Sequence, residues 1–213
     1  MHYWSFLFDD YWCFLIDAWW LFSPDANIIP ESVKFIDNLS INANIVIMKN
    51  GIIQQIGSPH FLYYNPINKY VAGFIGTPPM NFLTVKVLEK NGKIVCDGSS
   101  FEINPTDEQA KYLKDYIGKE VTFGIRPEDL KYVEKPAAKD DMQMKMIGKE
   151  FFGEETFLYL SSDIGQTIII KTTYNANFCL GDTVNVVPDM TKAKFFTIDE
   201  DELNICDQIN KEW

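Results

Sequence analysis

Residues 71–83 of this chain read VAGFIGTPPMNFL and join a helix end, a stop signal and the start of a strand. The preceding apolar residues recur at spacings of three and four, which predicts one helical face made of Ile67, Tyr70, Val71, Phe74 and Ile75. Gly76 can end that helix, and Pro78 and Pro79 prevent its continuation. Because a strand is predicted from Phe82 onward, we predict a junction between two domains here.

A β-hairpin is predicted upstream of this helix. Its first strand is the apolar run Ile45–Met48, and Asn50-Gly51 is the pair that tight hairpin turns prefer. Ser58 is suited to cap a helix and Pro59 to occupy its first turn, because proline there loses no needed donor. Asn65-Pro66 repeats this pattern, so a second helix is predicted to begin at Pro66.

Downstream of the junction, short strands and turns alternate. Lys90-Asn91-Gly92 predicts another hairpin, and Thr106–Gln109 is a capping box for a short helix that Gly118 closes. Further strands are predicted at residues 120–125, 142–152, 156–160, 167–172, 183–187 and 194–198. The predicted fold is therefore mainly β with short helices, and a small OB-like barrel fits this spacing best.

Composition excludes several classes of function. The net charge of −11 would repel a phosphate backbone, so nucleic acid is not an expected partner. The cysteines are widely spaced and form no CxxC pair, and the histidines are only His2 and His60, so neither a zinc site nor a disulfide framework is predicted. The four cysteines are Cys13, Cys96, Cys179 and Cys206. Isolated cysteines of this kind are typical of core residues in a reducing cytoplasm.

The first 22 residues are unusually rich in aromatic side chains. A signal peptide is not expected, because the first basic residue is Lys34 and the acids Asp9, Asp10 and Asp17 interrupt the apolar run. The same acids argue against a transmembrane helix. We interpret residues 1–44 as an atypical leader, the non-native product of a truncated or frame-disturbed gene. The alternative is a strand or helix that packs locally.

From residue 45 to 83 the chain resembles the ATP-binding subunits of maltose/multiple-sugar-type ABC importers. The shared order is a strand ending in Met48, a Lys-Asn-Gly turn, a Gln-Gln-Ile-Gly strand, Ser-Pro, Asn-Pro and a Phe-Ile-Gly helix end. The resemblance continues less densely at GIRPE (124–128) and EFFGEET (150–156). The chain departs from this pattern at two positions. These subunits often carry Arg at the position of Asn44, and they usually carry an acidic residue at the position of His60.

This resemblance implies a domain order. Residues 1–44 would be the leader, 45–76 the C-terminal remnant of an ABC nucleotide-binding domain, and 77–213 an OB-like (TOBE) regulatory domain. It also implies a regulatory and dimerisation role within a subunit that drives carbohydrate import, at the inner face of the cell membrane. The implied partners are a second copy, the permease subunits and a regulatory protein. Candidate regulatory or dimer contacts are Arg126, Glu128, Gly153, Glu154 and Thr156.

The motifs that bind and hydrolyse ATP are absent from the sequence. No segment contains the Gly-Lys-Ser/Thr end of a phosphate-binding loop. LSSDIGQ at 160–166 is only faintly similar to the family signature and predicts a hairpin turn, and the switch histidine position falls near Val33. FFTIDE at 195–200 imitates a magnesium-binding strand end, but it has no phosphate loop to act with. No catalytic, cofactor or metal residue is therefore assigned, and ATP and magnesium are implied only for the full-length parent.

Two other readings of the residues stay open. A stand-alone OB-like module could bind a small oxyanion or a sugar, although few lysines cluster. A hydrolase using Glu154 and Glu155 is weaker, because adjacent strand residues point to opposite faces. For Arg126 and Glu128, the plain interpretation is a structural turn in which the two charges pair.

We expect the purified chain to release no phosphate from ATP above the uncatalysed rate, because it lacks the phosphate-binding loop. A coupled phosphate-release assay with magnesium checks this, with a full-length subunit of the same type as the positive control. Turnover that survives further purification would contradict the prediction.

Overall fold

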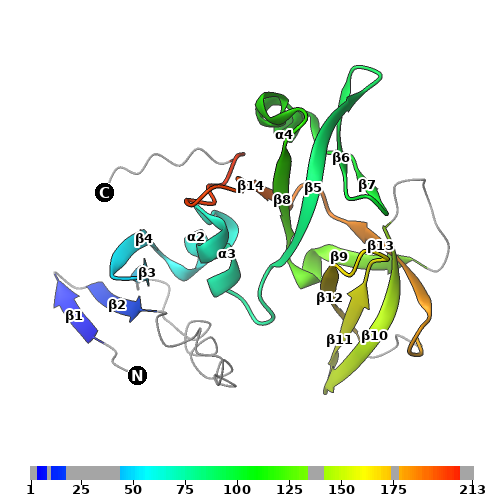
Figure 1. Cartoon of the computed structure of the whole chain (residues 1–213). Coiled ribbons are helices and arrows are strands. Elements are labelled where there is room, and N and C mark those ends of the chain that lie inside the picture. Colours follow the sequence, from blue (N-terminus) through cyan, green and yellow to red (C-terminus); the bar gives the residue numbers. More distant parts are fainter. Residues whose placement is uncertain (1–3, 9–10, 18–43, 134–141, 174–177, 207–213) are drawn as a thin grey trace. The chain divides into compact units, whose positions relative to one another are not determined.

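The structure is a computed structural model that describes residues 4–8, 11–17, 44–133, 142–173 and 178–206 (Figure 1). The chain divides into two compact units, Met1–Pro79 with Asp207–Trp213, and Met80–Cys206. The described residues are mainly β with short helices, as predicted. The division falls three residues beyond the predicted boundary at 76/77, while the identity assigned to each domain stays a prediction.

The first unit contains a four-stranded sheet in the order β1-β2-β3-β4. Its strands are β1 (Trp4–Phe8), β2 (Tyr11–Asp17), β3 (Asn44–Lys49) and β4 (Ile52–Gly57). β2 runs parallel to β3, and the other two pairs are antiparallel. The predicted leader thus contributes two strands, which corresponds to the alternative of a locally packing strand; whether it is native stays open. The predicted position of the switch histidine, near Val33, lies outside the described residues.

The β3–β4 hairpin has the predicted turn. Lys49 pairs with Ile52 across Asn50-Gly51, and both turn residues have the left-handed φ of a two-residue loop, 53° and 77°. Two short helices follow, α2 (Pro59–Tyr64) and α3 (Lys69–Phe74). Ser58 caps α2 by accepting from the amide of Phe61 at 3.2 Å, as predicted.

The second helix starts later than predicted. Asn65 is the C-cap of α2, and α3 is capped by Asn68, whose Oδ1 accepts from the amide of Val71 at 2.9 Å. The cause lies in β4. The buried Gln55 donates to the carbonyl of Asn65 at 2.8 Å and accepts from the amide of Ile67 at 2.9 Å. This pair of bonds holds residues 65–67 outside the helix.

The second unit contains two five-stranded sheets. The first has the order β14-β8-β5-β6-β7 and the second β12-β11-β10-β13-β9. The strands of the first are β5 (Asn81–Lys90), β6 (Lys93–Asp97), β7 (Glu102–Ile103), β8 (Glu120–Ile125) and β14 (Lys194–Phe196). Those of the second are β9 (Leu130–Val133), β10 (Met142–Phe152), β11 (Glu155–Ser161), β12 (Thr167–Thr173) and β13 (Thr183–Pro188).

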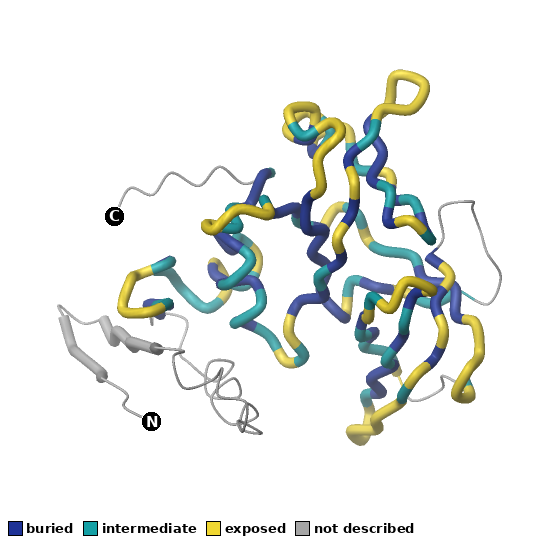
Figure 2. The backbone as a smooth tube through the Cα atoms, in the orientation of Figure 1, coloured by how far each residue is buried: buried dark blue, intermediate teal, exposed yellow. Residues whose placement is uncertain are grey.

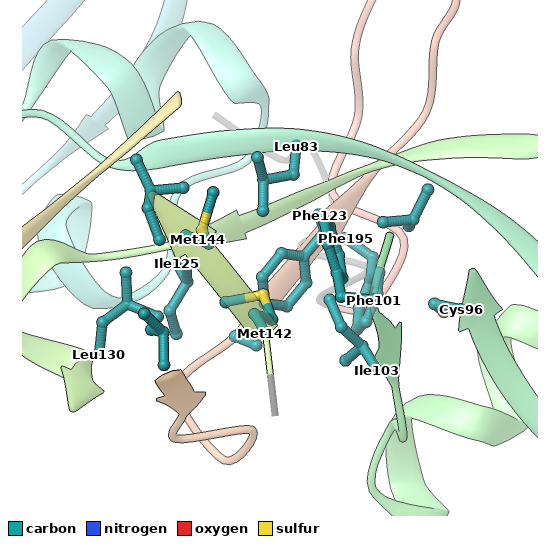
Figure 3. Close-up of a cluster of buried hydrophobic side chains, with 14 of the residues drawn as sticks. Leu83, Cys96, Phe101, Ile103, Phe123, Ile125, Leu130, Met142, Met144 and Phe195 are labelled. Carbon is teal, nitrogen blue, oxygen red and sulfur yellow. The ribbon is translucent and has the colours of Figure 1, made fainter. Parts of the chain in front are cut away.

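Both sheets of the second unit contribute to one hydrophobic core. Figure 3 shows Leu83, Phe123 and Phe195 of the first sheet in the same cluster as Met142 and Met144 of the second. Buried and exposed residues alternate along β5 and β10, as expected for strands with one face on a core (Figure 2). The first sheet's buried Cys96 belongs to this core, and burial raises the pKa of its thiol to about 12, which agrees with the predicted packing role.

The predicted capping box is present. Thr106 accepts from the amide of Gln109, and the Gln109 side chain accepts from the amide of Thr106, at the start of α4 (Asp107–Leu113). A 3-10 turn, η2 (Lys114–Tyr116), continues the helix to Gly118, whose φ is 84°. The last predicted strand, 194–198, ends at Phe196, because residues from Thr197 turn toward Leu203.

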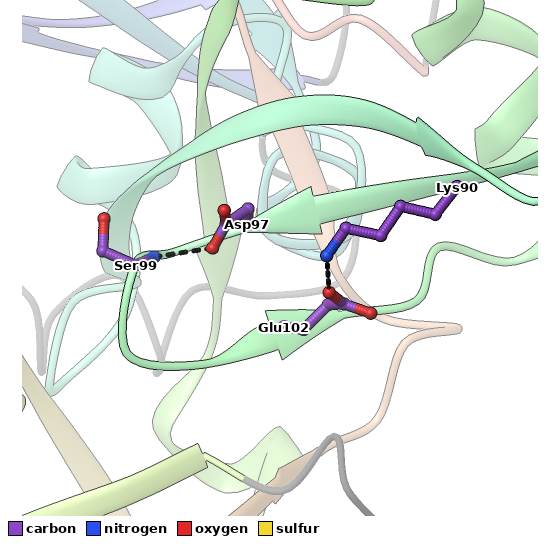
Figure 4. Close-up of polar contacts among 4 residues, drawn as sticks. All are labelled: Lys90, Asp97, Ser99 and Glu102. Carbon is purple, nitrogen blue, oxygen red and sulfur yellow. Dashed lines mark hydrogen bonds and ion pairs between the residues drawn. The ribbon is translucent and has the colours of Figure 1, made fainter.

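The outer arm formed by β5, β6 and β7 is held by polar contacts. Lys90 on β5 forms an ion pair with Glu102 on β7, and the carboxylate of Asp97 accepts from the amide of Ser99 at 2.9 Å (Figure 4). Asn91 and Gly92 make the predicted turn between β5 and β6, with φ of 52° and 75°. Both pairs of partners lie at the surface, so each contributes little to stability.

Two side-chain amides join the two sheets of the second unit. Asn81 on β5 donates to the carbonyl of Ile169 at 2.8 Å and accepts from its amide at 2.7 Å, along the outer edge of β12. Gln166, next to β12, accepts from the amide of Thr84 at 3.0 Å and donates to its carbonyl at 3.3 Å. We call these four bonds the amide clasp. Each side chain satisfies a backbone group where a neighbouring strand would otherwise pair.

We expect Asn81→Asp to lower the free energy of unfolding by about 1–3 kcal/mol, because the carboxylate replaces a donor with an acceptor facing the carbonyl of Ile169. The matched control is Asn91→Asp at the exposed β5–β6 turn, where aspartate is also accepted. Urea denaturation of both variants measures the difference. Equal urea midpoints for the two variants would contradict a stabilising role of the amide clasp.

Candidate functional site

The five predicted contact residues lie in two places in the second unit. Arg126 and Glu128 flank Pro127 at the turn between β8 and β9, where η3 (Pro127–Asp129) forms. Gly153, Glu154 and Thr156 lie at the hairpin that joins β10 to β11. These two places are far apart in the sequence, so the structure decides whether they form one surface.

The β10–β11 hairpin has a two-residue loop. Phe152 pairs with Glu155 across Gly153 and Glu154, and Gly153 has a left-handed φ of 70°. Glycine is suited to this loop because an L side chain at this φ would be strained. Gly153 and Glu154 are exposed, whereas Thr156 is fully buried, with no hydrogen-bond partner for its hydroxyl in the described structure. Thr156 can therefore affect a partner only through neighbouring residues.

The exposed apolar side chains of β10 were not predicted as site residues. Ile147, Phe151 and Phe152 are 52%, 55% and 59% exposed, and the ring of Phe152 lies 5.2 Å from that of Phe157. The exposure of a phenylalanine at this hairpin could have been predicted from the sequence. Adjacent residues on a strand point to opposite faces, so two consecutive phenylalanines cannot both enter one core. Figure 2 shows the exposed tip of this hairpin.

The turn at Arg126 combines a buried and an exposed charge. Arg126 is only 3% exposed, and its carbonyl accepts from the amide of Asp129 at 3.1 Å. Glu128 lies at the surface. The predicted pairing of Arg126 with Glu128 stays a prediction.

The structure brings this turn close to the base of the hairpin. η3 packs against β12, and Lys171 on β12 forms an ion pair with Glu155 on β11 at 2.7 Å. Both charges act on Glu128: Lys171 favours its ionised form and Glu155 opposes it. Glu128, Glu155 and the hairpin tip therefore belong to one region, which we call the hairpin surface.

The carboxyl groups at the turn are held less acidic than usual. Although residue Glu128 is exposed, desolvation of its carboxyl group raises its pKa, and the neighbouring Asp129 adds to the effect. Desolvation also raises the pKa of Asp129, followed by the charge of Asp189. The hairpin surface is thus apolar at its tip and acidic at its base. The described residues hold no cluster of side chains suited to a metal ion.

No helix in the described part of the chain is long and apolar enough to cross a bilayer.

We expect Glu128→Gln to stabilise the protein at neutral pH, by less than about 1 kcal/mol because the residue is exposed. A raised pKa in the folded state means that the stabilising contribution is present below the unfolded pKa and is lost as pH rises through the folded pKa. The gain should therefore fade as pH falls through the raised folded pKa and be absent below about 4, where glutamate is protonated in both states. Thermal melts between pH 3 and 8 test this, with Glu89→Gln as the exposed control. A gain that does not change with pH would contradict the assignment.

Comparison with known proteins agrees with this architecture. Residues 76–130 match the family described as the MalK OB fold domain. The oligosaccharides import ATP-binding protein MsmX of Bacillus subtilis is 36% identical over 161 residues, covering 74% of this chain and 43% of that protein. The trehalose/maltose import ATP-binding protein MalK of Thermococcus litoralis is 33% identical over 167 residues, covering 76% of this chain and 44% of that protein.

A solved structure of the molybdate-binding protein ModG aligns with a TM-score of 0.43 at 16% identity, covering 55% of this chain and 95% of that one. A likeness of this size establishes neither a ligand nor a function. The chain spans less than half the length of the curated relatives it matches, 43% and 44% of the two named above. Over about three quarters of its own length, this chain is homologous to the C-terminal part of sugar-import ABC ATPases, and it carries a MalK-type OB-fold domain.

Proposed function

We propose that this chain is the C-terminal regulatory and dimerisation portion of the ATP-binding subunit of a carbohydrate ABC importer. The observation that carries the proposal is the homology to sugar-import ATPases, which extends through the OB-fold domain. The sequence contains no phosphate-binding loop, so the role of the chain is binding rather than ATP hydrolysis. ATP and magnesium would belong to the full-length subunit, which works at the cytoplasmic face of the membrane beside its permease partners.

The hairpin surface is the best candidate for the contact with a second copy or with a regulatory protein. Phe151 and Phe152 expose large aromatic rings beside Gly153 and Glu154 at a tip that stands free of β13, since β13 pairs only with the first part of β10. Aromatic side chains are enriched among the residues that dominate binding energy at interfaces. Glu128 and Glu155 add acidic groups at the base, which would favour a partner with basic groups at its rim.

We expect the chain to form dimers with itself and to associate with a differently tagged full-length subunit of the same type. Phe151→Ser and Phe152→Ser, tested separately, should each weaken association about tenfold or more, the range expected for a central aromatic contact. The matched control is Ile164→Ser. Ile164 is 53% exposed at the hairpin on the opposite end of β11, so its loss should leave association unchanged.

Light scattering over a concentration series measures the self-association, and co-purification measures the mixed complex. Thermal melts of each variant identify losses caused by unfolding rather than by the missing contact. A chain that stays monomeric at about 0.5 mM and captures no full-length subunit would overturn the proposal. In that case, calorimetric titration with oxyanions and sugars would test the alternative of a stand-alone binding module.

A further inference from the structure

The central position of β3 in the first unit carries an inference that is independent of the proposed function. β3 is buried on both faces, with Ile45 and Ile47 at 0% exposed and Val46 at 4%. Strands buried on both faces are typical of the interior of a sheet, with a neighbour on each side. One neighbour of β3 is β4, which pairs with it in an antiparallel hairpin. The other neighbour is β2, in parallel register from Cys13 opposite Asn44 to Asp17 opposite Met48.

We propose that the outer edge of β3 accepts an apolar strand in parallel orientation, and that the N-terminal hairpin β1–β2 covers this edge and so keeps a second copy of the chain from pairing there. An uncovered apolar edge presents unpaired amides and carbonyls, and it is a template for pairing with another chain. A second copy is the relevant competitor because it presents the same β3 edge, and two uncovered edges can pair with each other.

The covering strand comes from the same chain. A parallel pair needs a crossover of about a dozen residues or more. Here 26 residues separate Asp17 from Asn44, which exceeds that minimum. A tether of this length keeps β2 at a high effective concentration near its own β3, so pairing within one chain outcompetes exchange between chains at ordinary protein concentrations.

The registers of the strand pairs identify which amides of β3 are protected by β2. Phe8 pairs with Tyr11 across a two-residue loop, so alternate residues of β2, including Phe14 and Ile16, direct their backbone groups to β3. In the parallel register Phe14 and Ile16 flank the pair of Leu15 with Val46, so the amide of Val46 faces β2 and those of Ile45 and Ile47 face β4. By the same alternation, the amide of Met48 also faces β2. Protection of Val46 and Met48 from hydrogen exchange therefore reports on β2 alone.

The first measurement is native hydrogen exchange on the unmodified full chain, resolved to single residues. We expect the amides of Val46 and Met48 to be protected within tenfold of those of Ile45 and Ile47. Exchange of Val46 and Met48 at the rate of an unstructured peptide, while Ile45 and Ile47 stay protected, would overturn the proposal without any mutation.

The second measurement uses proline, which removes one backbone donor. Ile16→Pro removes an amide that faces β3, and it should speed exchange at Val46 and Met48 at least tenfold and produce more self-association than the unmodified chain shows at the same concentration. The matched control is Leu7→Pro in β1, where the same register directs the amide away from β2, toward the outer side of the sheet. An Ile16→Pro chain that associates no more than the unmodified chain, with unchanged exchange, would contradict the proposal. Exchange in Met80–Cys206 serves as the internal control for overall folding.

Discussion

The second unit depends on the amide clasp between its two sheets. β5 pairs with β6 only from Lys86 onward, and β12 is the outermost strand of its sheet, so each has a stretch of backbone that lacks a strand neighbour. Asn81 and Gln166 supply the missing donors and acceptors. A side-chain amide suits this purpose because it carries a donor and an acceptor at the spacing of a peptide group. Hydrophobic packing joins the sheets without direction, whereas the clasp sets their register.

The same chemistry recurs at two other places where the described chain leaves regular structure. Gln55 binds both a carbonyl and an amide in the linker between α2 and α3. Gln109 completes the capping box and also donates to the carbonyls of Met190 and Ala193, which ties α4 to the loop before β14. Buried amides leave backbone groups satisfied without introducing charge, which costs far less than burying an ion. The acidic residues that give the chain its net charge can therefore remain at the surface.

The features to which we assign binding roles in our proposals lie outside this framework. The hairpin surface projects from a strand that outruns its neighbour β13, and its aromatic residues are not needed to complete the core. The proposed cover of β3 by the β1–β2 hairpin likewise involves the edge of a sheet rather than a cavity. Both suggest a protein whose work is done through strands and their contacts, in agreement with a homologous region that belongs to a larger transport subunit.

The sequence by itself determined the features that depend on a few neighbouring residues. Asn50-Gly51 and Asn91-Gly92 specify their turns because only certain residues adopt a left-handed φ, and Ser58 and Thr106 specify caps because their oxygens reach an amide three residues ahead. The mainly β fold and the resemblance to sugar-import ATPases could also be predicted, because both depend on short sequence motifs. Which strands meet could be seen only in the tertiary structure. Examples are the division of the second unit into two sheets, the parallel pairing of β2, the late start of α3 and the proximity of Glu128 to the hairpin. Each of these depends on partners ten or more residues away along the chain. The free energy of these contacts comes from shared burial and register, and no local pattern contains that information.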